Sequence, residues 1–168
     1  LIFITILFLV VFCFLYRIWL GLKRTLAAII QARQRQKRIR GYKALTQGMV
    51  AVAAGDATEA RRQAQKVNGL LGEPPLTKLL SAQAAQLNGD EKSAKIYFNE
   101  MLKRPETSFL GLRGLLMQAQ RNGKNTEALE LAGRAHTLKP KTPWILKTLF
   151  DLQLKEGEWR QALNTLDQ

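Results

Sequence analysis

The chain opens with an unbroken apolar run and continues as segments whose apolar residues recur at helical spacing. Residues 1–16 read LIFITILFLVVFCFLY and contain no charge, no Gly and no Pro. Such a segment rises about 24 Å as a helix, short of the roughly 30 Å core of a bilayer. The helix can continue to residue 22, because Arg17 can snorkel and Trp19 suits the headgroup boundary. The pattern therefore predicts a transmembrane helix over residues 1–22.

Two other interpretations of this run are weaker. A buried helix of a soluble core rarely contains so long a stretch without a polar residue. A signal peptide carries its cations before the apolar run and a small-residue cleavage site after it, whereas here the cations follow and no such site is present. The chain begins with Leu1 rather than Met, so we expect native sequence to precede it and to complete this helix.

The positive charge of the chain is concentrated directly behind the apolar run. The 168 residues carry 26 Lys and Arg against 13 Asp and Glu, a net charge of +13, and the first acidic residue is Asp56. A basic cluster beside a membrane helix is typical of the cytoplasmic side, where it is attracted to anionic lipids. Residues 23–40 contain no proline and are predicted as a helix near the headgroups or as a solvated linker. Nucleic-acid binding is the weaker explanation of this charge.

The residues expected to contact the membrane surface are the cations up to residue 40 and one interfacial aromatic residue. They are Arg17, Trp19, Lys23, Arg24, Arg33, Arg35, Lys37, Arg38 and Arg40.

From residue 41 onward the sequence repeats itself with a period of 34 residues. The period is carried by glycines and by the alanines that follow them: Gly55, Gly89, Gly123 and Gly157, with Ala60, Ala94, Ala128 and Ala162. The segments between them are alike: GDATEA, GDEKSA, GKNTEA and GEWRQA. A 34-residue period is typical of the tetratricopeptide repeat, a helix–turn–helix unit. Residues 41–168 are therefore predicted as four repeats, the last of them truncated.

The same register predicts where each helix begins and ends. Each glycine is expected to end a first helix, and each alanine to lie where two helices cross closely. The predicted helix pairs are 41–54 with 57–70, 75–88 with 91–104, 108–122 with 125–138, and 143–156 with 158–168. The last helix stops without a capping motif, whereas a solenoid normally ends in a polar cap. We therefore expect native sequence beyond Gln168.

The apolar positions of these helices define a predicted core stripe. It comprises Leu45, Val52, Leu79, Leu80, Ile96, Phe98, Leu102, Leu112, Leu115, Leu116, Leu129, Leu131, Leu146, Leu149, Phe150, Trp159 and Leu163.

Residues that could carry catalysis are scarce. The chain has no glycine-rich phosphate loop and no Ser/His/Asp set at a suggestive spacing. One Cys and one His exclude an internal disulfide and a zinc finger. His136 is expected at the surface or partly packed, with haem or metal ligation the weaker alternative, and Cys13 is expected as a small apolar residue within the first run. We therefore predict neither an enzyme nor a metal site.

Stacked repeats instead present a concave surface built from their first helices, and such surfaces bind peptide segments. The mixture of Met, Gln and Arg there suits an adaptable protein partner. The residues predicted to line it are Tyr42, Met49, Gln83, Gln86, Arg113, Met117, Gln120, Arg121, Lys147 and Asp151. The alternative is that they are ordinary solvated positions.

The order of apolar run, Arg/Gln-rich stretch and RGYKALTQGMVAVAAGDATEARRQAQKV resembles the N-terminal region of the bacterial HemY proteins. The residues that carry the resemblance are Arg40, Tyr42, Ala44, Leu45, Gly48, Ala51, Gly55, Asp56, Ala60 and Ala64. In that family two membrane helices precede a cytoplasmic repeat domain, and this chain would begin in the second. The resemblance implies a link to haem biosynthesis through a role that is not that of a recognised catalyst.

The sequence thus predicts an all-α protein, with an N-terminal transmembrane helix followed by a tetratricopeptide solenoid at the cytoplasmic face of the inner membrane. Its expected function is a scaffold that binds proteins and anionic lipids but not nucleic acid. The resemblance implies late haem-biosynthesis enzymes as partners. Two alternatives stay open: a factor for envelope assembly or quality control, and a protein that itself binds haem or acts as an enzyme. No cofactor is predicted, and haem is the one candidate.

Overall fold

The described part of the chain is entirely helical in its regular structure. The computed structural model describes residues 2–72 and 75–166, without the side chains of residues 2–11, 13, 15, 18 and 20–29. These ranges contain eight helices and no strand. The helices are α1 (Ile2–Ala54), α2 (Ala57–Leu71), α3 (Pro75–Leu87), α4 (Glu91–Leu102), α5 (Pro105–Arg121), α6 (Asn125–Leu138), α7 (Pro143–Lys155) and α8 (Trp159–Leu166).

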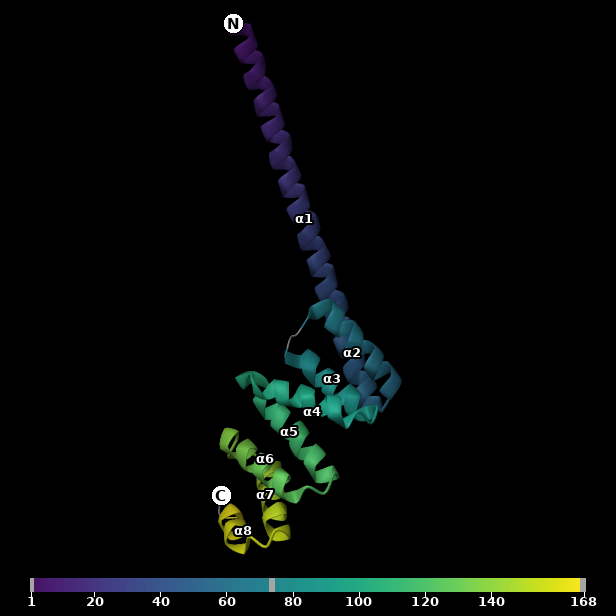
Figure 1. Cartoon of the computed structure of the whole chain (residues 1–168), viewed down its shortest axis with the longest axis vertical. Coiled ribbons are helices and arrows are strands. Elements are labelled where there is room, and N and C mark those ends of the chain that lie inside the picture. The colour runs from purple at the N-terminus through teal and green to yellow at the C-terminus, as the bar shows by residue number, and fades with distance from the viewer. Residues whose placement is uncertain (1, 73–74, 167–168) are drawn as a thin grey trace.

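Helix α1 is one uninterrupted helix of 53 residues. At 1.5 Å per residue it is about 80 Å long, and Figure 1 shows it as a straight rod that projects from the stack of the other helices. Residues 23–40 are therefore helical rather than a linker, and the first helix of the first repeat has no separate start at residue 41. In this rod the apolar run, the basic stretch and the first repeat share one axis.

No helix in the described part of the chain is both long enough and apolar enough to cross a bilayer. Most side chains of the predicted transmembrane segment, residues 1–22, lie outside the described residues, as do those of Lys23 and Arg24.

The repeat period governs the turns between paired helices. Gly55, Gly89, Gly123 and Gly157 all have positive φ, between 67° and 76°. In the first of these turns the Gly55 amide donates to the Val52 carbonyl, and the Asp56 amide donates to the Ala51 carbonyl at 2.9 Å. This pair of bonds is the Schellman arrangement, which requires a left-handed residue after the helix. The prediction that each glycine ends a first helix is confirmed.

The helix starts follow the same register in part. Asp56 accepts a hydrogen bond from the Glu59 amide at 2.9 Å, and Asp90 accepts one from the Ser93 amide at 3.0 Å. These two aspartates are therefore N-caps of α2 and α4. Helix α7 starts at Pro143 after Thr142, as predicted, although the threonine side chain makes no capping bond. Helix α5 starts at Pro105, three residues before the predicted residue 108, because proline is well suited to the first helical position.

The periodic alanines are among the most deeply buried of the described residues. Ala60, Ala94 and Ala128 have no exposed surface, and Ala162 is 1% exposed. Ala60 belongs to a smaller cluster with Leu45, Val67 and Leu80, and Ala94 and Ala128 belong to a larger one that runs from Ala82 to Leu152.

The prediction of burial is wrong for three residues of the core stripe. Ile96 is 59% exposed, Trp159 65% and Leu163 64%. Ile96 lies on the outer side of α4, and α8 packs only against α7 in the described chain, so one side of α8 has no neighbour. Met101, Val67, Ile145 and Leu152 are buried instead.

Candidate functional site

The first helices α1, α3 and α5 form one continuous layer, and side-chain contacts of Trp144 join α7 to α5. Helix α3 packs against both α1 and α5, in addition to its own second helix α4. The predicted partner-binding residues lie on α1, α3, α5 and α7, and we call the surface of these helices that carries them the first-helix face. Side chains that recur at the 34-residue period lie at equivalent places on successive first helices.

Most of the predicted binding residues are exposed on this face. Met117 is 47% exposed, Tyr42 59% and Met49 36%. Arg113, Gln120, Lys147 and Asp151 are exposed, and Gln83 and Gln86 are half-buried.

A second set of apolar residues follows the same period and is missing from the sequence prediction. Tyr42, Leu76, Leu110 and Trp144 are separated by 34 residues each and belong to four successive first helices. Leu76 is 51% exposed, and Leu110 and Trp144 are half-buried. Of the four, only Tyr42 was among the predicted binding residues. The signal that could have found Leu76, Leu110 and Trp144 is their 34-residue spacing from it.

Arg113 is held in place by aromatic rings. Its guanidinium carbon lies 5.4 Å from the centroid of the Trp144 ring, a cation–π distance. Trp144 in turn meets Phe109 edge-on, with 6.1 Å between the ring centroids. These contacts join α5 to α7. They fix the orientation of the Arg113 guanidinium on the first-helix face. A carboxylate that binds it would therefore cost less side-chain conformational entropy of Arg113.

Arg121, which was predicted to line the concave surface, contacts α4 in the structure. Its guanidinium makes an ion pair with Glu91 of α4 at 3.1 Å. This contact directs the side chain toward the second helix of the preceding repeat. Arg121 thus supports the packing of α5 on α4 in this structure.

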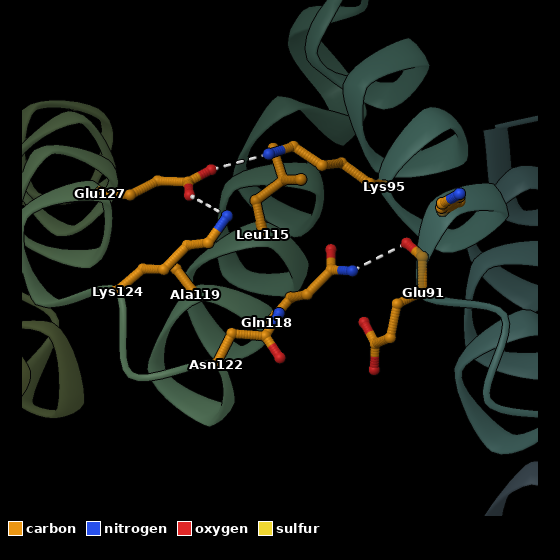
Figure 2. Close-up of a pocket in the computed structure, with 9 residues that line it drawn as sticks. Glu91, Lys95, Leu115, Gln118, Ala119, Asn122, Lys124 and Glu127 are labelled. Atoms are coloured by element: carbon orange, nitrogen blue, oxygen red, sulfur yellow. Dashed lines mark hydrogen bonds and ion pairs between the residues drawn. The ribbon is translucent and has the colours of Figure 1, made fainter.

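The same region contains a pocket of about 170 Å³ between α4, α5 and α6 (Figure 2). Lys95 reaches Glu127 at 2.8 Å, and Lys124 approaches the other oxygen of that carboxylate at 3.6 Å. Gln118 donates to the backbone carbonyl of Glu91 at 2.8 Å. The hydrogen bond from Lys95 is the main cause of a lowered pKa for Glu127. Because both oxygens of the Glu127 carboxylate already face lysines, this carboxylate offers a ligand no unpaired negative charge.

An equivalent groove of about 320 Å³ lies one repeat earlier, between α2, α3 and α4. Its lining is more polar and includes Arg61, Asn68, Ser81, Asp90 and Tyr97. Several of its hydrogen-bonding groups are already used within the fold: Asn68 donates to Ser81 at 3.3 Å, and Asp90 caps α4. The two grooves are thus consequences of the repeat geometry, and neither gathers groups suited to catalysis.

The described residues contain no cluster suited to a metal ion. No group of three or more His, Cys, Asp and Glu side chains is placed to hold a metal ion there. His136 is half-buried, and its Nε2 atom is buried without a hydrogen-bond partner among the described residues. The side chain of Cys13 lies outside them.

The predicted membrane-contact residues on α1 are strung along the rod. Arg17 and Trp19 are exposed, and the Trp19 ring lies 6.2 Å from that of Tyr16. The cations of residues 33–40 are also exposed. Because α1 is straight, they lie about 17–27 Å along its axis from residue 22. These distances exceed the screening length for charges, which is roughly 8 Å at physiological salt.

The fold and its exposed face define a helical repeat protein with a long N-terminal helix. The family model described as HemY protein N-terminus matches residues 1–89, which is more than half of the chain. The chain belongs to this family. The matched region spans α1, α2 and α3 and ends at the glycine turn before α4. Neither the curated proteins nor the solved structures contain a match.

Proposed function

We propose that the protein is a membrane-anchored scaffold of the tetratricopeptide type, which binds partner proteins on its first-helix face. The observation that carries the proposal is the pair of residue columns on that face. One column is Tyr42, Leu76, Leu110 and Trp144, and the other is Met49, Gln83, Met117 and Asp151. Both columns cross four helices at a fixed spacing, so an extended or helical segment can contact several repeats at once.

The chemistry of the face supports a protein ligand. Exposed Met and Tyr side chains provide apolar contacts that adapt to different shapes. Arg113, fixed by Trp144, provides a charged anchor in a position where arginine is often important for binding. The face thus combines apolar area with an oriented cation.

The anchor would be the apolar segment of α1, residues 1–22. An anchored scaffold confines its partners to the membrane surface and thereby raises their effective concentration. The basic residues after the segment favour the cytoplasmic side of a bacterial inner membrane. Membership of the HemY family is the ground for proposing late haem-biosynthesis enzymes as partners.

The test is a crosslinked pull-down of the full-length protein from native membranes, followed by mass spectrometry. A variant with Met49, Arg113, Met117 and Lys147 changed to Glu runs beside the wild type. Because these side chains are exposed, we expect the variant to fold and to recover haem-pathway enzymes at least tenfold less well.

The matched control is Ile96→Glu, which introduces the same charge at an exposed apolar position on α4, outside the first-helix face. It should leave recovery unchanged. Recovery of haem enzymes equally by the wild type and the face variant would refute the proposed binding surface. Recovery of envelope-assembly proteins instead would refute the proposed partners.

A further inference from the structure

A different surface of α1 lacks the neighbour that its counterparts have. In α5 the residues Thr107, Gly111, Gly114 and Gln118 are all buried. They face α4, the second helix of the preceding repeat. The Thr107 hydroxyl donates to the Met101 carbonyl at 2.9 Å, and the Gln118 amide donates to the Glu91 carbonyl at 2.8 Å. Any Cβ added at Gly114 would overlap the Phe98 ring.

The same register is buried in the other later repeats. Thr77 and Leu80 of α3 have no exposed surface, and neither does Ile145 of α7. Each of these first helices thus packs one defined strip against the second helix that precedes it. This packing of a first helix on the preceding second helix recurs within the chain. It shows what kind of helix fits against the strip.

In α1 the equivalent strip is open. Two periods before the α5 residues stand Ile39, Lys43, Thr46 and Val50, which we call the α1 edge. Ile39 is 64% exposed and Val50 62%, and the other two are also exposed. Within the described chain α1 packs only against α2 and α3. Gly41 faces Leu71 of α2 and Gly48 faces Leu80 of α3, and neither glycine belongs to the α1 edge. A solenoid that ends in solvent normally carries polar residues on its outer strip, whereas this strip places two β-branched apolar side chains in water.

The charge around the α1 edge limits what can cover it. Lys43 lies within the strip, Arg35 lies one turn before Ile39 on the same side, and no acidic residue occurs before Asp56. A second copy of the chain would bring these cations against their own equivalents, which is unfavourable. A helix with acidic residues beside its apolar stripe would complement both the apolar residues and the charge.

We propose that the α1 edge binds an acidic amphipathic helix of a partner protein, which occupies the place of the second helix of a preceding repeat. Because Thr46 and Lys43 stand where α5 has Gly114 and Gly111, the partner helix would lie farther from α1 than α4 lies from α5. Its apolar side chains would contact Ile39 and Val50, and its acidic residues would lie opposite Arg35 and Lys43. This surface is separate from the first-helix face, so the proposal does not depend on the partners bound there.

The probe for the test is a synthetic amphipathic helix of about four turns. Its stripe repeats the spacing of Phe98, Met101 and Leu102, and its flanks carry Glu. A matched probe has Lys at every Glu position. Binding of each labelled probe to the full chain in mild detergent is measured by fluorescence anisotropy, with empty micelles as the blank.

We expect the acidic probe to bind at least about tenfold more tightly than the basic probe, and to weaken as salt is raised. Val50→Glu should reduce its binding by a similar factor, because it places an anion in the strip. Ile96→Glu, an equally exposed apolar-to-acid change on α4, should have no effect, and nor should Met117→Glu on the first-helix face.

Three results would overturn the proposal. The first is equal binding of the two probes, and the second is an equal loss in Val50→Glu and Ile96→Glu. The third is a dimer of the chain in sedimentation velocity that dissociates in Val50→Glu, since this would make a second copy the occupant. Helicity measured by circular dichroism identifies a variant that fails to fold, and Lys43→Glu then replaces it.

Discussion

At the scale of single residues, glycine has two distinct functions in this chain. At Gly55 and its three periodic counterparts the backbone has positive φ, which other residues rarely adopt. At Gly48 and Gly114 the backbone is helical, and the need is for space: an added Cβ would lie 2.6 Å from Leu80 at Gly48 and would overlap Phe98 at Gly114. The first function is predictable from the repeat period. The second is not, because the crowding side chain comes from another helix.

The distinction predicts opposite effects for one substitution at two helical glycines. Gly114→Ala should lower the free energy of unfolding by about 1–3 kcal/mol, because Phe98 must move from its buried site. Gly133→Ala should raise it by about 0.5–1 kcal/mol, since no atom lies within 4 Å of the added Cβ and alanine favours the helix. Urea unfolding followed by circular dichroism measures both. A stabilised Gly114→Ala would contradict the packing of α5 on α4 described above.

At the scale of helices, the sequence predicted which segments are helical better than where each one ends or packs. The 34-residue period placed the glycine turns, whereas aspartate caps occur at the start of α2 and α4 but not of α6, where Lys124 takes that position. The period could not show that α1 passes through residues 22 and 40 without a break, because continuity depends on the absence of a stop signal. Burial of Ile96 and Trp159 was mispredicted for a related reason: apolar character does not reveal whether a neighbouring helix covers a side chain.

The N-cap of α4 predicts how stability depends on pH. Hydrogen bonds from the side chain and amide of Ser93 hold the pKa of Asp90 below its ordinary value of 3.8. The folded state therefore favours the carboxylate, so this contribution to stability is complete above that value and is lost as the pH falls through the lowered pKa. Asp90→Ala should lower the melting temperature at pH 7, and the difference from wild type should shrink as the pH is lowered below 3.8. Asp90→Asn retains a capping group that does not titrate, so it should be close to wild type at pH 7 and should not share the loss of stability of wild type as the pH falls below 3.8. A deficit in Asp90→Ala that is the same at every pH would rule out the ionised cap.

At the scale of the whole molecule, the repeats explain why the proposed binding surface was only partly predictable. The period predicts that Tyr42, Met49 and Met117 lie on first helices, and all three are exposed there. It could not foresee that Arg121 would pair with Glu91, or that Trp144 would fix Arg113, because both contacts join different repeats. The open α1 edge was equally hidden, since the first repeat has the same sequence period as the later ones and differs only in which helices lie beside it.

The unbroken helix α1 also fixes the direction in which the first-helix face points around the helix axis. Because a helix turns by about 100° per residue, the number of residues between the proposed anchor and the first repeat fixes the direction in which the first-helix face points around the rod axis. Two residues inserted near Gln34 would swing that face by about 200° while lifting it only about 3 Å. Seven inserted residues, about two full turns, would nearly restore the original direction of the face and lift it by about 10 Å. Partner recovery in the pull-down should therefore fall with the two-residue insertion and return with the seven-residue one, whereas a steady decline with length would show that height above the membrane matters and azimuth does not.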